Sequence, residues 1–312
     1  MPSFFLFSGA FVTMKLKSPY LIKPHGKVRL DHISTSTHDG FADKGAAEPI
    51  LAKHRHQLAD LQDVFYASQA KALLIVLQGM DTAGKDGTIN HIFSGINPQG
   101  CDVASFKVPT PLEARHYFLW RCQVQTPPRG MIMIFNRSHY EDVLSPRVHG
   151  LISAKTAHDR MEDINRWEQS LTDNDTVVLK FFLHISHEEQ TRRLQSRIDD
   201  PDKHWKLSPA DFAERQFWPK YAEAYEDILT RTSHKHAPWF VIPSDNKWFR
   251  NVAISQILVE AMKGLKLKYP KPTFDPTGLK LSDETSQSAS KKVNARQNKS
   301  NIAAAESTSG KH

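Results

Sequence analysis

Short hydrophobic runs alternate with longer amphipathic stretches through the middle of the chain. Several of these runs are apolar at every position rather than at alternate positions, as is typical of strands buried on both faces of a sheet. Alternating strands and helices predict an α/β fold, in which a parallel sheet is flanked by helices on both faces. The predicted strands are residues 72–77, 103–108, 131–135, 177–185 and 239–242.

The stretches between these runs show the apolar spacing of amphipathic helices. Pro219 falls inside one of them, so this element is expected to be kinked or divided in two. Ser208 and Pro209 are typical N-cap and first-turn residues at its start. The predicted helices are 49–68, 86–95, 111–124, 154–171, 187–199, 208–232 and 248–264.

The two ends of the chain differ in composition from this middle part. Residues 1–13 carry an apolar cluster without a preceding basic segment, and we expect a disordered or non-native extension with Met14 as an alternative start. Residues 14–68 are expected to form an arm followed by a helix, and residues 69–270 the main domain. Residues 271–312 are rich in Ser, Lys, Gln and Asn and are expected to be disordered, because they cannot bury enough apolar area.

The charge balance narrows the class of partner. The chain has 312 residues and a formal charge of +7, which favours an anionic partner such as nucleic acid, phospholipid, nucleotide or polyphosphate. Cys101 and Cys122 are too few for a disulfide framework and lack a zinc-binding spacing, so reduced thiols and a cytoplasmic location are expected. No segment is apolar for long enough to predict a membrane span.

A glycine-rich loop follows the first predicted strand. Its sequence is Gly79-Met80-Asp81-Thr82-Ala83-Gly84-Lys85-Asp86-Gly87, and a helix is predicted directly after it. A strand, a glycine loop, a Gly-Lys pair and a helix in this order are typical of a P-loop. The glycines let backbone N–H groups converge on phosphate oxygens, and Lys85 adds a cation.

Two acidic residues of this loop need separate interpretation. Asp86 stands where Ser or Thr ordinarily follows the lysine and holds Mg²⁺, so the loop departs from the usual pattern. Asp81 is a candidate metal ligand, and capping of the following turn is the alternative.

A polar cluster follows the strand 131–135. P-loop enzymes place a metal- or water-anchoring residue at such a strand end, and here this residue is Asn136. An amide binds Mg²⁺ less strongly than a carboxylate, so we expect Glu141 or Asp142 to compensate. The planar guanidinium of Arg137 suits phosphate oxygens and predicts a transition-state clamp, with a salt bridge to either carboxylate as the alternative.

Residues 187–210 form a basic insertion that Pro201 interrupts. Arg193 and Arg197 are four residues apart and therefore share one helix face, and Lys203 and Lys206 follow. A broken basic segment of this kind is typical of a mobile lid that closes over phosphates and excludes water. Exposed surface charge is the alternative interpretation.

These segments together resemble the polyphosphate kinase 2 family over residues 18–270. The resemblance implies that residues 69–270 form a P-loop kinase domain with a helical basic lid. It also implies an enzyme that exchanges phosphoryl groups among inorganic polyphosphate, AMP, ADP and ATP with Mg²⁺. The segments that carry it are 78–88, 97–100, 105–110, 136–141, 200–206 and 237–243.

The family implies roles for individual residues of this chain. Asp81 and Asn136 would hold Mg²⁺, although many relatives have Asp where this chain has Asn136, and Lys85 and Arg137 would grip the transferred phosphate. The nucleotide would contact Gly79, Gly84, Asp86, Gly87, Lys107 and Glu141. Glu141 is similar to the subgroup that accepts nucleoside monophosphates, which implies phosphorylation of AMP to ADP and of ADP to ATP. The polyphosphate would contact Arg192, Arg193, Arg197, Lys203 and Lys206.

Two other functions fit the same loop. An ATP-dependent nucleoside monophosphate kinase would use a similar lid for a short triphosphate, and a non-enzymatic nucleotide- or nucleic-acid-binding protein would bind phosphates without turnover. No nucleic-acid-binding module is recognisable, so neither a nucleic-acid nor a membrane partner is expected. A homo-oligomer is expected, with the helix 154–171 as a candidate surface.

Overall fold

The computed structural model describes residues 17–24, 26–277 and 279. The chain divides into two units, the first ending at Tyr269 and the second beginning at Pro270. The described residues of the second unit form no helix or strand. The extension predicted for residues 1–13 and most of the tail predicted for 271–312 lie outside the described residues, and the fold below is that of the first unit.

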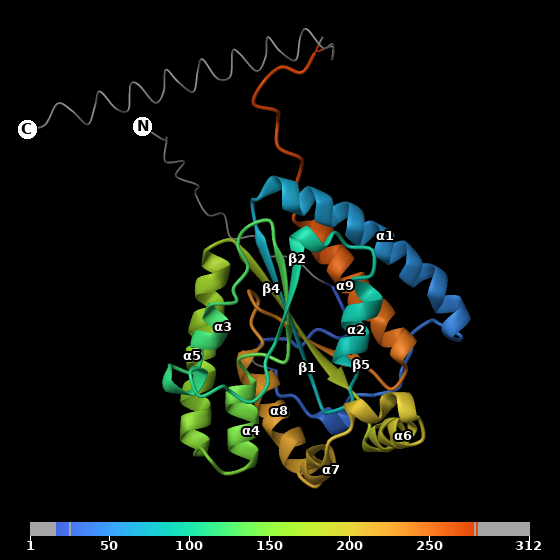
Figure 1. Ribbon diagram of the computed structural model, residues 1–312, viewed down its shortest axis with the longest axis vertical. Helices are drawn as coiled ribbons and strands as arrows, with labels where there is room; N and C mark the ends of the chain where they lie inside the picture. The colour runs from blue at the N-terminus through green and yellow to red at the C-terminus, as the bar shows by residue number, and fades with distance from the viewer. Residues whose placement is uncertain (1–16, 25, 278, 280–312) are drawn as a thin grey trace, which may run out of the picture. The chain divides into compact units, whose positions relative to one another are not determined.

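Five parallel strands form one sheet in the order β2-β3-β1-β4-β5 (Figure 1). The predicted α/β architecture with a parallel sheet is confirmed. The central strand is buried along its whole length, as its unbroken apolar sequence predicts. The strands are β1 (Ala72–Gly79), β2 (Cys101–Ser105), β3 (Ile132–Asn136), β4 (Thr176–His184) and β5 (Trp239–Pro243).

Helices cover both faces of the sheet. On one face α1 and α2 pack against α9, and on the other α4, α5 and α8 pack against one another (Figure 1). The helices are α1 (Lys44–Ser68), α2 (Lys85–Ile92), α3 (Trp120–Gln123), α4 (Glu141–Val148), α5 (Ala154–Asp173), α6 (His187–Ile198), α7 (Pro209–Arg215), α8 (Trp218–Thr232) and α9 (Lys247–Gly264). Among the described residues no helix is both long and apolar enough to cross a membrane.

Two predicted elements are shorter than expected, and one helix was not predicted. The strand predicted to reach residue 108 ends at Ser105, since β2 is an edge strand and the polar loop after it leaves the sheet. The helix predicted for 111–124 is only a single 3₁₀ turn at Glu113–Arg115 followed by the short α3. Helix α4 was not predicted, because it has only eight residues and contains Pro146.

The stretch with Pro219 is divided as expected. Helix α7 ends at Arg215, and α8 begins at Trp218 with Pro219 in its first turn. Proline is tolerated there, because the first N–H groups of a helix have no partner inside the helix. Helix α1 begins five residues earlier than predicted, since the Asp43 side chain accepts a hydrogen bond from the N–H of Ala46 and caps the helix.

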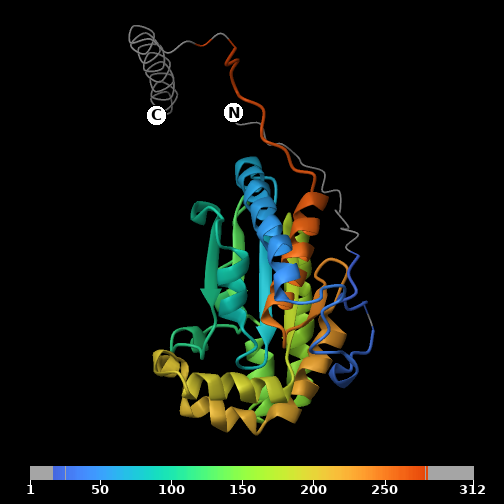
Figure 2. The ribbon, with the colours of Figure 1, turned by 90° about the vertical axis from the view of Figure 1, so that its right-hand side faces the viewer.

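The parallel sheet brings all strand ends of one kind to the same edge. At the carboxyl edge, Leu77 of β1 pairs with Asn136 of β3, so the glycine loop and the polar cluster after β3 are neighbours. Helices α6 and α7 lie across this end of the sheet (Figure 2). The carboxyl edge is therefore where the predicted phosphate chemistry has to occur.

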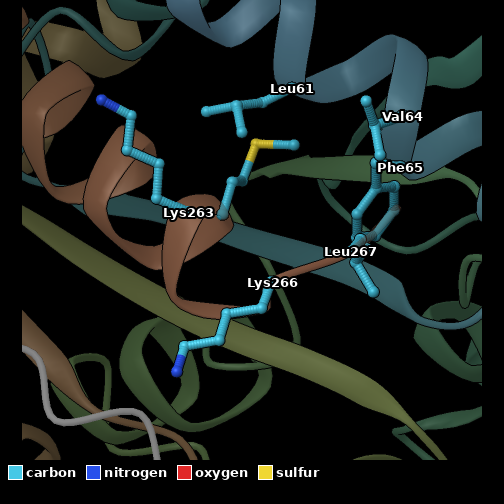
Figure 3. Close-up of a pocket in the computed structure, with 7 residues that line it drawn as sticks. Leu61, Val64, Phe65, Lys263, Lys266 and Leu267 are labelled. Atoms are coloured by element: carbon cyan, nitrogen blue, oxygen red, sulfur yellow. The ribbon is translucent and has the colours of Figure 1, made fainter. Parts of the chain in front are cut away.

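A small cavity lies between α1 and α9, away from this edge. Its volume is about 180 Å³, and Figure 3 shows the lysine ammonium groups pointing away from its apolar centre. No residue predicted for phosphate binding borders it, so it has no part in the site. The lining residues are Leu61, Val64, Phe65, Met262, Lys263, Lys266 and Leu267.

Candidate active site

Two glycines set the path of the loop between β1 and α2. Gly79 has φ +156°, and a Cβ there would lie 2.8 Å from the carbonyl oxygen of Leu183. Gly84 has φ +99°, and a Cβ there would lie 2.1 Å from Nη1 of Arg250. Any larger residue at either position would have to displace its neighbours. The loop conformation thus depends on glycine at both positions.

Two buried arginines hold the back of this loop. Arg193 Nη1 donates hydrogen bonds to the carbonyl oxygens of Thr82 and Ala83, both at 2.9 Å, and Arg250 Nη1 donates to the same Ala83 oxygen at 3.1 Å. The C=O and N–H of a trans peptide point in opposite directions. The N–H of Gly84 is therefore directed away from the arginines, to the side on which a phosphate would bind.

Arg193 cannot also bind polyphosphate in this arrangement. It is 7% exposed, its Nε donates to Glu189 at 2.7 Å, and its Nη2 donates to the carbonyl oxygens of Ser244 and Asp245. Every guanidinium nitrogen is thus bonded inside the protein. The sequence assigned Arg193 to the substrate because helical spacing cannot tell a buried face from an exposed one.

The catalytic lysine candidate is also buried. Lys85 is 9% exposed, and its Nζ donates to the carbonyl oxygens of Gly79 at 3.1 Å and Met80 at 3.4 Å. Burial and, to a smaller extent, the nearby Arg137 lower the pKa of Lys85 to about 8, against the opposite effect of Asp81, Glu141 and Asp86. A bound anion would favour the charged form.

Asn136 has an unexpected partner. Its Nδ2 donates to Oδ1 of Asp86 at 2.6 Å. We expected Glu141 or Asp142 to compensate for the missing carboxylate, but Asp142 pairs with Arg121 at 2.8 Å, and the carboxylate beside Asn136 is that of Asp86. An ordinary P-loop enzyme has an acidic residue at the strand end where this chain has Asn136. Here the carboxylate is that of Asp86, directly after Lys85.

The carboxylate of Asp81 provides an oxygen free for a ligand. Its Oδ2 is buried and has no hydrogen-bond partner among the described residues, as is also true of Thr82 Oγ1. This oxygen caps no turn, which argues against the alternative interpretation of Asp81. No group of three or more His, Cys, Asp or Glu side chains in the described part of the chain could hold a metal alone. A cation here would share its ligands with substrate phosphates and water, as Mg²⁺ usually does.

Arg137 and Glu141 lie together just after β3. Arg137 has φ +63°, and its Nη1 lies 3.6 Å from Oε2 of Glu141. Its side chain is 44% exposed, so the salt bridge leaves it accessible to phosphate. Lys107 is exposed one residue after Phe106, whose N–H donates to the carbonyl oxygen of Asn136. These cations all lie at the carboxyl edge.

Comparisons with known proteins agree with this geometry. The family model described as polyphosphate kinase 2 matches residues 42–270. The chain belongs to the polyphosphate kinase 2 family. It is 46% identical over 256 residues to an AMP/ADP-polyphosphate phosphotransferase of Meiothermus ruber, covering 81% of this chain and 95% of the relative. It is 43% identical over 273 residues to an ADP-polyphosphate phosphotransferase of Rhodopseudomonas palustris, covering 83% and 94%.

A solved structure shares the fold. The polyphosphate kinase 2 of Arthrobacter aurescens TC1 superposes with a TM-score of 0.79 and 40% sequence identity, covering 82% of this chain and 92% of that one. The P-loop kinase-like fold is therefore shared with an experimentally solved member of the family.

The basic residues predicted for the lid of this polyphosphate kinase 2 fall into two groups. Arg193 is buried, as described above. The other four cations lie at least partly at the surface: Arg192, Arg197, Lys203 and Lys206. Arg192 pairs with Glu189 and is 72% exposed, and Lys206 lies over the ring of the exposed Trp205.

The sequence does not predict the contact of Arg250 with the glycine loop. Arg250 lies on α9, far along the chain from the loop, and no local pattern connects the two. Burial and the neighbouring Arg193 lower the pKa of Arg250 to about 9. Glu189, by contrast, could have been found, because it precedes Arg193 by four residues on one helix and such pairs interact.

Replacing Gly84 tests the conformation of the loop. We expect Gly84→Ala to weaken binding of inorganic tripolyphosphate by at least about tenfold, because the methyl group displaces Arg250 and disfavours the required φ. Isothermal titration calorimetry measures this. Gly95→Ala is the control, since Gly95 has φ +90° but open space around its Cβ position, and it should bind normally. Equal binding by both variants would contradict the loop assignment.

The lowered pKa of Lys85 predicts a pH dependence. The lysine is charged below its pKa of about 8 and neutral above it, so the affinity of the free protein for polyphosphate should fall as the pH rises through this value. The dissociation constant for polyphosphate, measured between pH 7 and pH 9.5 at constant ionic strength, should begin to rise near pH 8, at the pKa of Lys85 of about 8. Lys85→Arg stays charged and should lose this inflection. An identical inflection in Lys85→Arg would assign it to another group.

Proposed function

We propose that this chain transfers phosphoryl groups from inorganic polyphosphate to adenine nucleotides, converting AMP to ADP and ADP to ATP. The observation that carries the proposal is the phosphate loop clamped from behind by Arg193 and Arg250, in a chain of the polyphosphate kinase 2 family. The Meiothermus ruber relative is named for AMP and ADP and the Rhodopseudomonas palustris relative for ADP, which supports these acceptors.

The proposed reaction is a direct in-line transfer. A phosphate oxygen of AMP or ADP attacks the terminal phosphorus of polyphosphate, and the bond to the next bridging oxygen breaks, leaving a polyphosphate one unit shorter. Lys85 and Arg137 offset the charge that develops on the transferred group. Lys107 and Glu141 orient the acceptor, and Gly79, Gly84, Asp86 and Gly87 line the place where the acceptor meets the terminal phosphate of the donor.

The donor is proposed to lie along the lid. Arg192, Arg197, Lys203 and Lys206 are accessible cations on the segment that lies across the carboxyl edge (Figure 2). Lid closure would neutralise phosphate charge and keep water from the transferred group.

Magnesium fits the acidic side of the site. Asp81 would hold it through its unpartnered Oδ2, and Asp86, oriented by Asn136, would bind it directly or through water. When bound, Mg²⁺ neutralises phosphate oxygens and aligns donor and acceptor.

Other partners and the location stay predictions. Both cysteines are free, which is compatible with the expected cytoplasmic location. A homo-oligomer and the absence of a nucleic-acid partner also stay predictions.

The donor is tested by a product assay. Purified protein is incubated with Mg²⁺ and long-chain polyphosphate, separately with AMP, ADP and GMP, and the nucleotides are separated by chromatography over time. ADP and ATP should form only in the presence of polyphosphate. Lys85→Met should reduce turnover on the order of 100-fold or more, because a buried charge at the transferred phosphate is lost.

A second arm supplies ATP and AMP without polyphosphate. Rapid formation of ADP there, with no product from polyphosphate, would support the ATP-dependent nucleoside monophosphate kinase instead. No turnover in either arm, together with salt-dependent binding of nucleic acid, would support the non-enzymatic alternative.

A further inference from the structure

A buried ionic cluster lies beneath the segment that joins β3 to α4. Glu168 of α5 and Lys180 of β4 are both 0% exposed, and Lys180 Nζ lies 2.5 Å from Glu168 Oε2. Lys180 also donates to the carbonyl oxygen of Thr232 at 2.7 Å. Burial favours the neutral form of Glu168, but the charge of Lys180 and the bonds from its neighbours outweigh this and lower the pKa of the carboxyl group.

This cluster holds two successive side chains of the joining segment. Burial lowers the pKa of His139, so the neutral ring donates its Nε2–H to Glu168 Oε1 at 3.1 Å. The hydroxyl of Tyr140 donates to the same oxygen at 2.9 Å and accepts from Lys180 Nζ at 3.0 Å. Glu168 thus accepts hydrogen bonds from three residues, two in the joining segment and one in β4.

The preceding residue is fixed from another direction. Ser138 Oγ accepts a hydrogen bond from Gln78 Nε2 at 3.1 Å, and Gln78 is the penultimate residue of β1. The side chains of Ser138, His139 and Tyr140 are all fully buried. Burial and these hydrogen bonds therefore restrain three consecutive residues between the end of β3 and the start of α4.

The residues on either side of this tripeptide belong to the site. Arg137 precedes it with φ +63°, and Glu141 follows it as the first residue of α4. The tripeptide joins the backbones of Arg137 and Glu141. The contacts of His139 and Tyr140 with the buried cluster therefore hold the backbone positions from which both side chains reach the site.

Stability alone is a poor explanation for such a cluster. Desolvating two charges opposes folding, and replacing a buried ion pair by apolar residues of similar volume is often neutral or stabilising. A cluster that fixes polar groups of one loop has a use that apolar packing cannot supply, because only the charged Glu168 can accept bonds from His139, Tyr140 and Lys180 at once.

We propose that Glu168 and Lys180 are positioning residues that control the choice between AMP and ADP as phosphoryl acceptor. They act through Arg137, which faces the transferred phosphate, and Glu141, which faces the acceptor. The distance from the nucleoside to the attacking phosphate differs between AMP and ADP. The proposal rests on the proposed function. It adds to that function two buried residues that act without contacting a substrate.

The test compares acceptors within one preparation. The ratio of kcat/KM for AMP to kcat/KM for ADP is measured with polyphosphate as donor, because the fraction of folded enzyme cancels in this ratio. Glu168→Gln keeps the side-chain volume and removes the charge, and it should change the ratio by on the order of tenfold. The KM for polyphosphate should change less than this ratio, because most of the proposed polyphosphate contacts lie on residues 187–210 and not on Arg137.

Three further variants provide reference values for the change in this ratio. Glu141→Asn alters the acceptor side directly and should change the same ratio. Glu260→Gln is the matched control, since Glu260 is exposed on α9 and its side-chain partner among the described residues is Gln256, and its ratio should equal that of the parent. Tyr140→Phe removes one hydroxyl and leaves the ion pair, so it should fold and give a smaller change in the same direction as Glu168→Gln.

The outcomes separate positioning from stability. A lower melting temperature with an unchanged ratio in both Glu168→Gln and Tyr140→Phe would overturn the proposal. If the parent transfers no phosphoryl group from polyphosphate, the proposed function fails by itself. The ratio of the dissociation constants for AMP and ADP, measured by calorimetry, then decides the positioning role in the same variants.

Discussion

The hydrogen bonds from Arg193 and Arg250 to the carbonyl oxygens of Thr82 and Ala83 are the interaction on which the site depends. They fix the loop from behind, so that the peptide N–H of Gly84 is available in front without reorganisation when a phosphate arrives. The two arginines come from α6, within residues 187–210, and from α9. The loop conformation is thus a property of the whole first unit and not of the glycine-rich sequence alone.

Positive charge is divided between two tasks in this protein. Buried guanidinium groups shape the backbone. The hydrogen-bond partners that the Arg250 guanidinium has among the described residues are Asn251 and the Ala83 carbonyl, so no carboxylate there compensates its charge near the phosphate site. The exposed cations of residues 187–210 are the ones we propose to contact substrate phosphates. A formal charge of +7 counts both kinds equally, so composition indicates an anionic partner but not which cations bind it.

The sequence predicts the elements that local pattern defines and misses contacts between distant residues. The apolar runs predict all five strands, and the order strand, glycine loop, Gly-Lys and helix predicts the phosphate loop. The spacing of Arg193 and Arg197 shows a shared helix face but not its burial, and nothing near Arg250 indicates its partner loop. The bond between Asn136 and Asp86 joins two departures from the usual pattern that look unrelated in sequence.

The most direct test is the affinity of Arg250→Met for inorganic tripolyphosphate, measured by calorimetry beside the parent and the control Arg231→Met. Arg231 is a 44% exposed arginine on α8 whose partner is Asp227. The account predicts that Arg250→Met remains folded by circular dichroism and binds at least about tenfold more weakly, because the loop loses one of its two clamps and a nearby charge. Unchanged affinity in folded Arg250→Met would contradict the central role of the clamp.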